Sequence, residues 1–175
     1  MEFEILHAIQ GIRNETLDIF MAWYTTIGDH GLIWIFLSIG LLAFAKTRFL
    51  GKVCLLSLLL EVLAVTFTLK PLIDRVRPCM TEALQAPLAQ ACYNSPSFPS
   101  GHTAAAFAVA AAIFCVNKTW GMIALMSAAL MGFTRLYFFV HFPSDVLAGA
   151  IVGSLCGYLA YRIYSRYDAL KNQAQ

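Results

Sequence analysis

Charged side chains are scarce in this chain. Only 13% of its 175 residues are charged, the formal net charge is +2, and no basic stripe with interleaved aromatic residues occurs. Nucleic-acid-binding domains gather Lys and Arg on one face, so we exclude a nucleic acid as a partner. The five cysteines lack Cys-x-x-Cys or Cys/His ligand spacing, which argues against a zinc or iron–sulfur centre.

Hydrophobic residues, in contrast, make up 59% of the chain and recur in runs separated by short polar breaks. A membrane-spanning helix needs roughly 20 mostly apolar residues. We therefore predict an all-α fold, a polytopic membrane helical bundle of about six transmembrane helices that forms one domain over residues 1–175. The predicted helices cover residues 17–27, 32–45, 53–69, 103–116, 120–137 and 145–164.

The ends and connections of the chain predict its orientation. Residues 1–13 place apolar side chains on one helical face, which is typical of a short helix lying in the membrane interface. Short loops rich in Lys and Arg stay cytoplasmic, which assigns the turn at 46–52, the turn at Lys118 and the tail 165–175 to that side. The connections at Asp29, 70–102 and 135–145 then share the extracytoplasmic face.

One carboxylate, Glu61, lies in the middle of the third predicted membrane helix. Such a residue is costly in a membrane and is expected to face the bundle. Two interpretations stay open: a structural partner such as Thr66 or another hydroxyl, or a place in the lining of a substrate path.

The stretch Pro99-Ser100-Gly101-His102 directly precedes an apolar helix. Ser100 offers a hydroxyl and an N-cap, Gly101 allows a ligand to approach the backbone, and free amides at a helix N-terminus attract anions. The bland alternative is a capped helix start. The other interpretation is a phosphate-binding turn.

Two cations, Lys70 and Arg77, stand seven residues apart on the same predicted face of the membrane. This separation spans about two helical turns and would aim both side chains the same way. Asp74 and Arg75 lie between them and are placed to pair with each other. Snorkelling anchors at a membrane boundary are the alternative for this pair of cations.

A third cluster contains Arg135, His141 and Asp145. Asp145 follows His141 by four residues, where its carboxylate can accept the ring N–H and leave the other nitrogen free for attack. Cations, two histidines and one orienting carboxylate suit phosphoryl transfer, which needs donors around the phosphoryl oxygens, a nucleophile and an acid. Few carboxylates are available for magnesium, so we expect no metal and no cofactor.

Together these motifs resemble the three signatures of the type 2 phosphatidic acid phosphatase family, over residues 70–145. The matching patterns are Lys70-x6-Arg77-Pro78, Pro99-Ser100-Gly101-His102 and Thr134-Arg135-x5-His141-x3-Asp145. The third signature usually opens with serine, and threonine here keeps the hydroxyl. The resemblance implies a metal-independent, six-helix membrane lipid phosphatase.

The resemblance also implies roles for individual residues. His141 would be the nucleophile that forms a phosphohistidine, and Asp145 would orient it. His102 would protonate the leaving lipid oxygen and then help to activate water. The implied phosphate-binding residues are Lys70, Arg77, Ser100, Gly101 and Arg135.

The small size of the chain resembles that of short bacterial members that act on undecaprenyl diphosphate or phosphatidylglycerol phosphate. An outward-facing site favours hydrolysis of undecaprenyl diphosphate to undecaprenyl phosphate in the cell membrane. The alternatives are a phosphatidylglycerol-phosphate or phosphatidate phosphatase, or a lipid phosphotransferase. A non-enzymatic binder or transporter of anionic lipids would explain neither the two histidines nor Asp145.

Two further features remain open in the sequence. Cys79 and Cys92 lie in the predicted extracytoplasmic loop that joins the first two motifs, and they form either a disulfide or two free thiols. The oligomeric state of the chain is not readable from the sequence.

Overall fold

The computed structural model describes residues 1–28, 31–82, 92 and 95–173, and this part of the chain is helical, with no strand. The N-terminal half contains α1 (Glu2–Gln10), α2 (Glu15–Ile27), α3 (Leu32–Leu42), α4 (Arg48–Ala64), the π-helix η2 (Val65–Leu69), α5 (Lys70–Ile73) and α6 (Pro78–Thr81). The C-terminal half contains α7 (Gly101–Val116), α8 (Lys118–Tyr137) and α9 (Pro143–Gln173).

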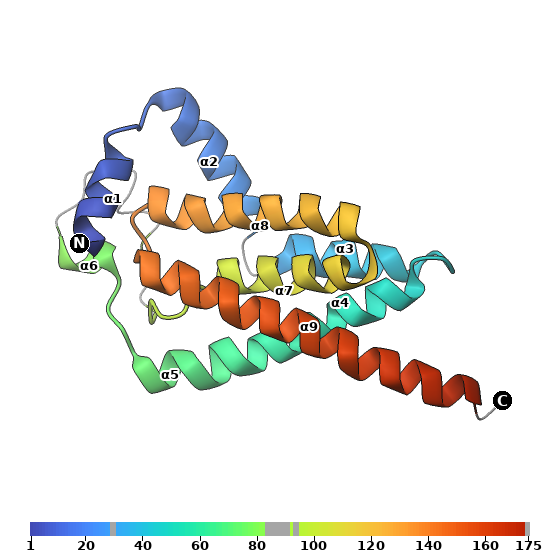
Figure 1. Cartoon of the computed structure of the whole chain (residues 1–175). Helices are drawn as coiled ribbons and strands as arrows, with labels where there is room; N and C mark the ends of the chain where they lie inside the picture. Colours follow the sequence, from blue (N-terminus) through green and yellow to red (C-terminus); the bar gives the residue numbers. More distant parts are fainter. Residues whose placement is uncertain (29–30, 83–91, 93–94, 174–175) are drawn as a thin grey trace.

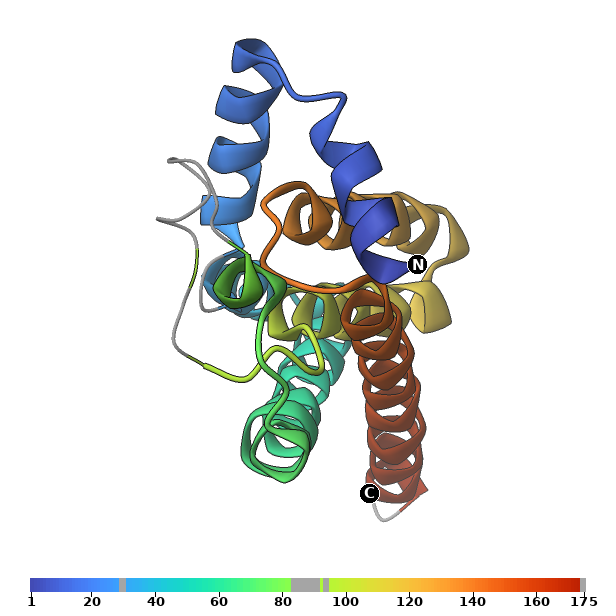
Figure 2. The same ribbon diagram turned by 90° about the vertical axis from the view of Figure 1, so that its left-hand side faces the viewer.

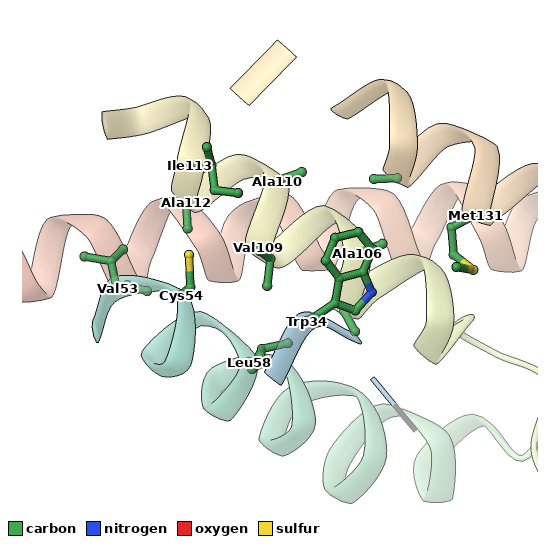
Figure 3. Close-up of a cluster of buried hydrophobic side chains, with 13 residues drawn as sticks. Trp34, Val53, Cys54, Leu58, Ala106, Val109, Ala110, Ala112, Ile113 and Met131 are labelled. Atoms are coloured by element: carbon green, nitrogen blue, oxygen red, sulfur yellow. The ribbon is translucent and has the colours of Figure 1, made fainter. Parts of the chain in front are cut away.

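Helix α7 is the centre of the bundle. Alanines dominate its sequence and most of its residues are buried, as expected for a helix that is apolar on all sides. It packs mainly against α9, α8 and α4, which surround it in both views of the molecule (Figures 1 and 2). The main hydrophobic cluster lies along this helix, where Val109 meets Trp34 of α3 and Leu58 of α4 (Figure 3).

Small residues bring α9 and α7 into close contact. Gly149, Gly153 and Gly157 recur at four-residue intervals and share one face of α9. A Cβ atom on Gly149 would lie only 2.6 Å from the carbonyl oxygen of Ser100, and one on Gly153 would overlap the backbone of Ala104. The two helices pack at a separation that leaves no room for larger side chains.

Four helix ends meet at one end of the bundle. At the opposite end of the bundle, Asn117 ends α7, and its side chain accepts a hydrogen bond from the Trp120 amide at 3.0 Å. Helix α8 therefore returns antiparallel to α7 after a tight turn. Helix α9 then begins beside the start of α7, and α5 ends on the same side (Figure 1). Helix α1 covers this end. The motifs predicted to carry the chemistry are therefore brought together.

The predicted elements are recovered with shifted boundaries. The helix predicted to end at residue 164 continues to Gln173, so 165–173 are helical rather than a separate tail. The predicted extracytoplasmic connection 70–102 contains α5 and the short helix α6. Residues 29–30, 83–91, 93–94 and 174–175, which include Asp29, lie outside the described part.

By length and composition, two stretches are long and apolar enough to span a membrane: residues Arg48–Thr81 and Pro143–Gln173. Helices α2 and α3 qualify only together, as one pair bent by 53°, and α7 is a shorter apolar helix. These findings concern the described residues. They fit a helical membrane protein. The total of six membrane spans and the position of α1 in the membrane interface stay predictions.

Candidate active site

A cavity of about 570 Å³ opens among the helix ends. Six of the eight predicted site residues line it: Lys70, Arg77, Gly101, His102, Arg135 and His141. The other two, Ser100 and Asp145, are fully buried and do not line it. The three motifs, which are far apart in the chain, thus face one space.

His141 lies in the short connection between α8 and α9 and is 1% exposed. Its Nε2 atom is 3.3 Å from Nη1 of Arg77, and its Nδ1 atom is 3.3 Å from the hydroxyl oxygen of Ser97. Arg77 has no acceptor to offer, so the hydrogen-bond network assigns the ring proton to Nδ1. The lone pair of Nε2 is then directed to the cationic side of the site.

Asp145 is the third residue of α9 and is held from several directions. One oxygen, Oδ2, accepts the Phe142 amide at 2.8 Å and a hydrogen bond from the Ser97 hydroxyl. An acidic third residue that reaches back to the amide before a helix is a common N-terminal cap. The other oxygen, Oδ1, accepts Nη1 of Arg75 at 2.7 Å.

The sequence predicted that Asp145 accepts the His141 ring N–H directly, and this geometry is wrong. The two atoms concerned, Nδ1 and Oδ2, are 3.6 Å apart, which is too long for a hydrogen bond. Ser97 lies between them instead. Its hydroxyl oxygen faces Nδ1 of His141, and its hydroxyl group donates a hydrogen bond to the carboxylate of Asp145. The observed chain is His141–Ser97–Asp145.

Arg77 is held beside His141 by hydrogen bonds to Ser95 and Val140. Its Nε and Nη2 atoms donate to the carbonyl and hydroxyl oxygens of Ser95, and Nη1 donates to the carbonyl of Val140. The expected two-turn helical spacing from Lys70 is wrong, because α5 ends at Ile73 and Asp74 adopts a left-handed conformation with φ 42°. Both cations nevertheless line the cavity.

Arg135 approaches from α8, where Nη1 donates to the Thr25 hydroxyl of α2 at 2.6 Å. Burial lowers the pKa of His141 below its usual value, and the positive charges of Arg77 and Arg135 lower it further, against the opposing charge of Asp145. The imidazole is therefore held neutral, the form that can act as a nucleophile.

Ser100 and Gly101 form the turn that leads into α7. Ser100 occupies the N-cap position, but its hydroxyl makes no capping bond and accepts one from Thr103 at 2.9 Å. Gly101 lines the cavity, and a Cβ atom on it would meet no atom of another segment within 4 Å among the residues that the structure describes. Direct phosphate binding by Ser100 remains a prediction. Thr134, likewise buried, donates its hydroxyl to the carbonyl of Met131.

Three other expectations can be compared with the structure. Arg75 does not pair with Asp74 but with Asp145 and Glu2. Glu61 lines the cavity and, within the described residues, makes no hydrogen bond to Thr66, which supports the substrate-path interpretation. Cys79 and Cys92 form a disulfide rather than two free thiols.

Ser97, Ser95 and Arg75 were not among the predicted site residues. Ser97 stands two residues before Pro99, so its position next to the motif was a usable signal. No comparable signal marks Arg75, because its partners lie 70 and 73 residues away in the chain.

The model of the PAP2 superfamily matches residues 51–168. Lipid A 4'-phosphatase of Bacteroides thetaiotaomicron is 30% identical, with 97% of this chain and 79% of that protein covered. Undecaprenyl-diphosphatase BcrC of Bacillus subtilis is 28% identical, with 93% and 83% covered.

A solved structure supports the same assignment. It is the first transmembrane PAP2-type phosphatidylglycerolphosphate phosphatase, from Bacillus subtilis, with a TM-score of 0.74 and 27% identity. The match covers 93% of this chain and 84% of that one. Since the family model spans most of the chain and one relative is 30% identical over nearly all of it, the protein belongs to the PAP2 superfamily.

Proposed function

We propose that this protein is a membrane lipid phosphatase that works through a phosphohistidine on Nε2 of His141. The observation that supports this most is the arrangement of the His141 ring. One nitrogen is tied to Ser97, and the other faces Arg77 at the wall of the cavity. A buried, neutral and oriented imidazole beside a cluster of cations is what nucleophilic attack on a phosphoryl group requires.

In the first step Nε2 of His141 attacks the terminal phosphorus, and the bond from that phosphorus to its leaving oxygen breaks; in a lipid diphosphate this is the bridging oxygen, which departs with the lipid phosphate. His102, which lines the same cavity from the first turn of α7, donates a proton to that oxygen. In the second step water attacks the phosphohistidine, His102 takes a proton from the water, and inorganic phosphate leaves with His141 restored. The two histidines thus serve as nucleophile and as acid and base.

The cations supply most of the electrostatic stabilisation. Lys70, Arg77 and Arg135 line the same cavity as His141, and so does Gly101 at the start of α7. Negative charge that builds up on the phosphoryl oxygens would meet donors that are already in place. Ser100 is then expected to act mainly by fixing the backbone of this turn.

For the substrate we propose undecaprenyl diphosphate, cleaved on the extracytoplasmic face to undecaprenyl phosphate. The full-length similarity to an undecaprenyl-diphosphatase supports this choice. The cavity also has apolar walls at Ile35, Leu58 and Val62, which suit the start of a lipid tail. The similarity to lipid A 4'-phosphatase favours a second candidate, a phosphorylated glycolipid.

The test is phosphate release by purified protein in detergent with EDTA. Undecaprenyl diphosphate, lipid A, phosphatidylglycerol phosphate and phosphatidate are offered separately, with His141→Ala in parallel. We expect release from undecaprenyl diphosphate to persist in EDTA and to vanish in the variant. An acid-labile, alkali-stable phosphoenzyme should form in the parent only. Transfer of the phosphoryl group to another lipid would indicate a phosphotransferase, and no turnover of any lipid would leave an anionic-lipid binder.

A further inference from the structure

Arg75 connects the site to the N-terminal helix of the protein. Its Nη1 atom donates to Oδ1 of Asp145 at 2.7 Å and to the hydroxyl of Ser144 at 2.6 Å. Its Nη2 atom donates to a carboxylate oxygen of Glu2 in α1 at 2.6 Å. The guanidinium also lies over the ring of Phe142, 4.0 Å from its centre, next to His141 in the chain.

Glu2 is held by the start of α9 as well. Its second oxygen accepts the amide of Ser144 at 3.1 Å and the hydroxyl of the same residue at 2.7 Å. Burial acts to raise the pKa of Glu2, but the hydrogen bonds from Ser144 and Arg75 outweigh it and lower that pKa overall. The carboxylate therefore remains charged and complements the positive end of α9.

Apolar contacts fasten α1 to the same segment. The ring of Phe3 meets that of Phe142 edge-on at 5.3 Å, and Leu6 is fully buried together with Phe139. Helix α1 therefore packs directly against the connection that holds His141. Figure 2 shows α1 beside the start of α9.

We propose that Arg75 is a positioning residue for the reaction and that Glu2 of α1 holds it in place. Ser97 and the Phe142 amide occupy Oδ2 of Asp145, and Arg75 holds the other oxygen. Without Arg75 the carboxylate can rotate. The Ser97 hydroxyl then loses the acceptor that keeps its oxygen against Nδ1 of His141, and the ring is no longer fixed.

This inference rests on the proposed role of His141 as the nucleophile. A misplaced reacting group costs on the order of 10- to 100-fold in rate. We expect Arg75→Gln to lower kcat by about this factor while KM changes less than about threefold, because Arg75 is not among the residues that line the cavity. Arg75→Lys keeps the charge and should recover part of kcat.

Glu2 is tested against a matched residue of the same helix. Glu2→Gln weakens the contact to Arg75 and should lower kcat a few fold. Glu4→Gln should leave kcat unchanged, since Glu4 is exposed and, within the described part of the chain, its carboxylate pairs with the N-terminal amine alone, at 3.4 Å. Parent-like kcat in folded Arg75→Gln, or a change in KM alone, would overturn the inference. If Arg75→Gln does not fold, equal kcat values for Glu2→Gln and Glu4→Gln would overturn it. Full activity of His141→Ala would instead refute the proposed function.

Discussion

The buried hydroxyl of Ser97 offers the sharpest test of how His141 is oriented. Ser97→Ala removes the oxygen that faces Nδ1 of His141 at 3.3 Å and the proton that binds Asp145. Ser97 is fully buried, so no solvent replaces the lost group. An unsatisfied buried donor costs about 1–3 kcal/mol, and bonds to charged groups lie at the upper end of this range.

The rate effect follows from this magnitude. If about 2–3 kcal/mol is lost from the transition state, kcat falls roughly 30- to 150-fold. KM should change little, because Ser97 does not line the cavity. The assay compares kcat with the rate of phosphoenzyme formation by rapid quench, and both should fall together.

A matched control variant separates the effect of losing the orientation of His141 from the effect of losing any buried hydroxyl. Ser38 is equally buried, and its hydroxyl donates within α3 to the carbonyl of Trp34 at 2.7 Å. Ser38→Ala should keep the parental kcat. A kcat of Ser97→Ala within about twofold of the parent would refute the reasoning. In that case Asp145 would orient His141 without the serine, either across the observed 3.6 Å between Nδ1 and Oδ2 or after these two atoms approach each other on substrate binding.

Three other changes have defined outcomes. Gly101→Ala adds a methyl group that meets no described atom of another segment within 4 Å, so the melting temperature should hold while kcat/KM falls as the methyl takes space from the phosphoryl group. Replacing both Cys79 and Cys92 by serine should lower the free energy of unfolding by about 3 kcal/mol, and reductant should lower the melting temperature of the parent but not of this variant. Glu61→Gln removes an ionisable carboxyl group from the cavity wall; if this group repels the head group of an anionic lipid, KM should fall by about threefold at unchanged kcat, whereas a higher KM would show that the carboxyl group donates a hydrogen bond to the head group.

The sequence allowed the location of much of the candidate site to be predicted, because the order of the helices in the chain determines which of their ends lie together. Alternating helices return to the same end of the bundle, so Lys70, His102 and His141 had to share a face once their helices were located. The cavity contains all three. The assignment of single side chains to one face of a bundle is thus robust to errors of a few residues in helix boundaries.

Contacts that depend on where a chain turns were not predictable. The pairing of Asp74 with Arg75 was reasonable for neighbours, but the left-handed conformation of Asp74 ends α5 and changes the course of the chain before Arg75. Arg75 then meets Asp145 across 70 residues of sequence. Similarly, the distance between His141 and Asp145 depends on the turn into α9, and a four-residue spacing alone does not determine it.

The glycines of α9 explain how the second and third motifs keep their register. The amide of Ser100 donates to the carbonyl of Asp145 at 3.0 Å, which joins the start of α7 to the start of α9. This bond requires the helix axes to lie close together, and the missing side chain of Gly149 permits it, since a Cβ there would reach the Ser100 carbonyl. A larger side chain at Gly149 would push the first turn of α7, with His102, away from His141. A packing feature inside the bundle therefore sets the distance between the nucleophile and the acid of the proposed reaction.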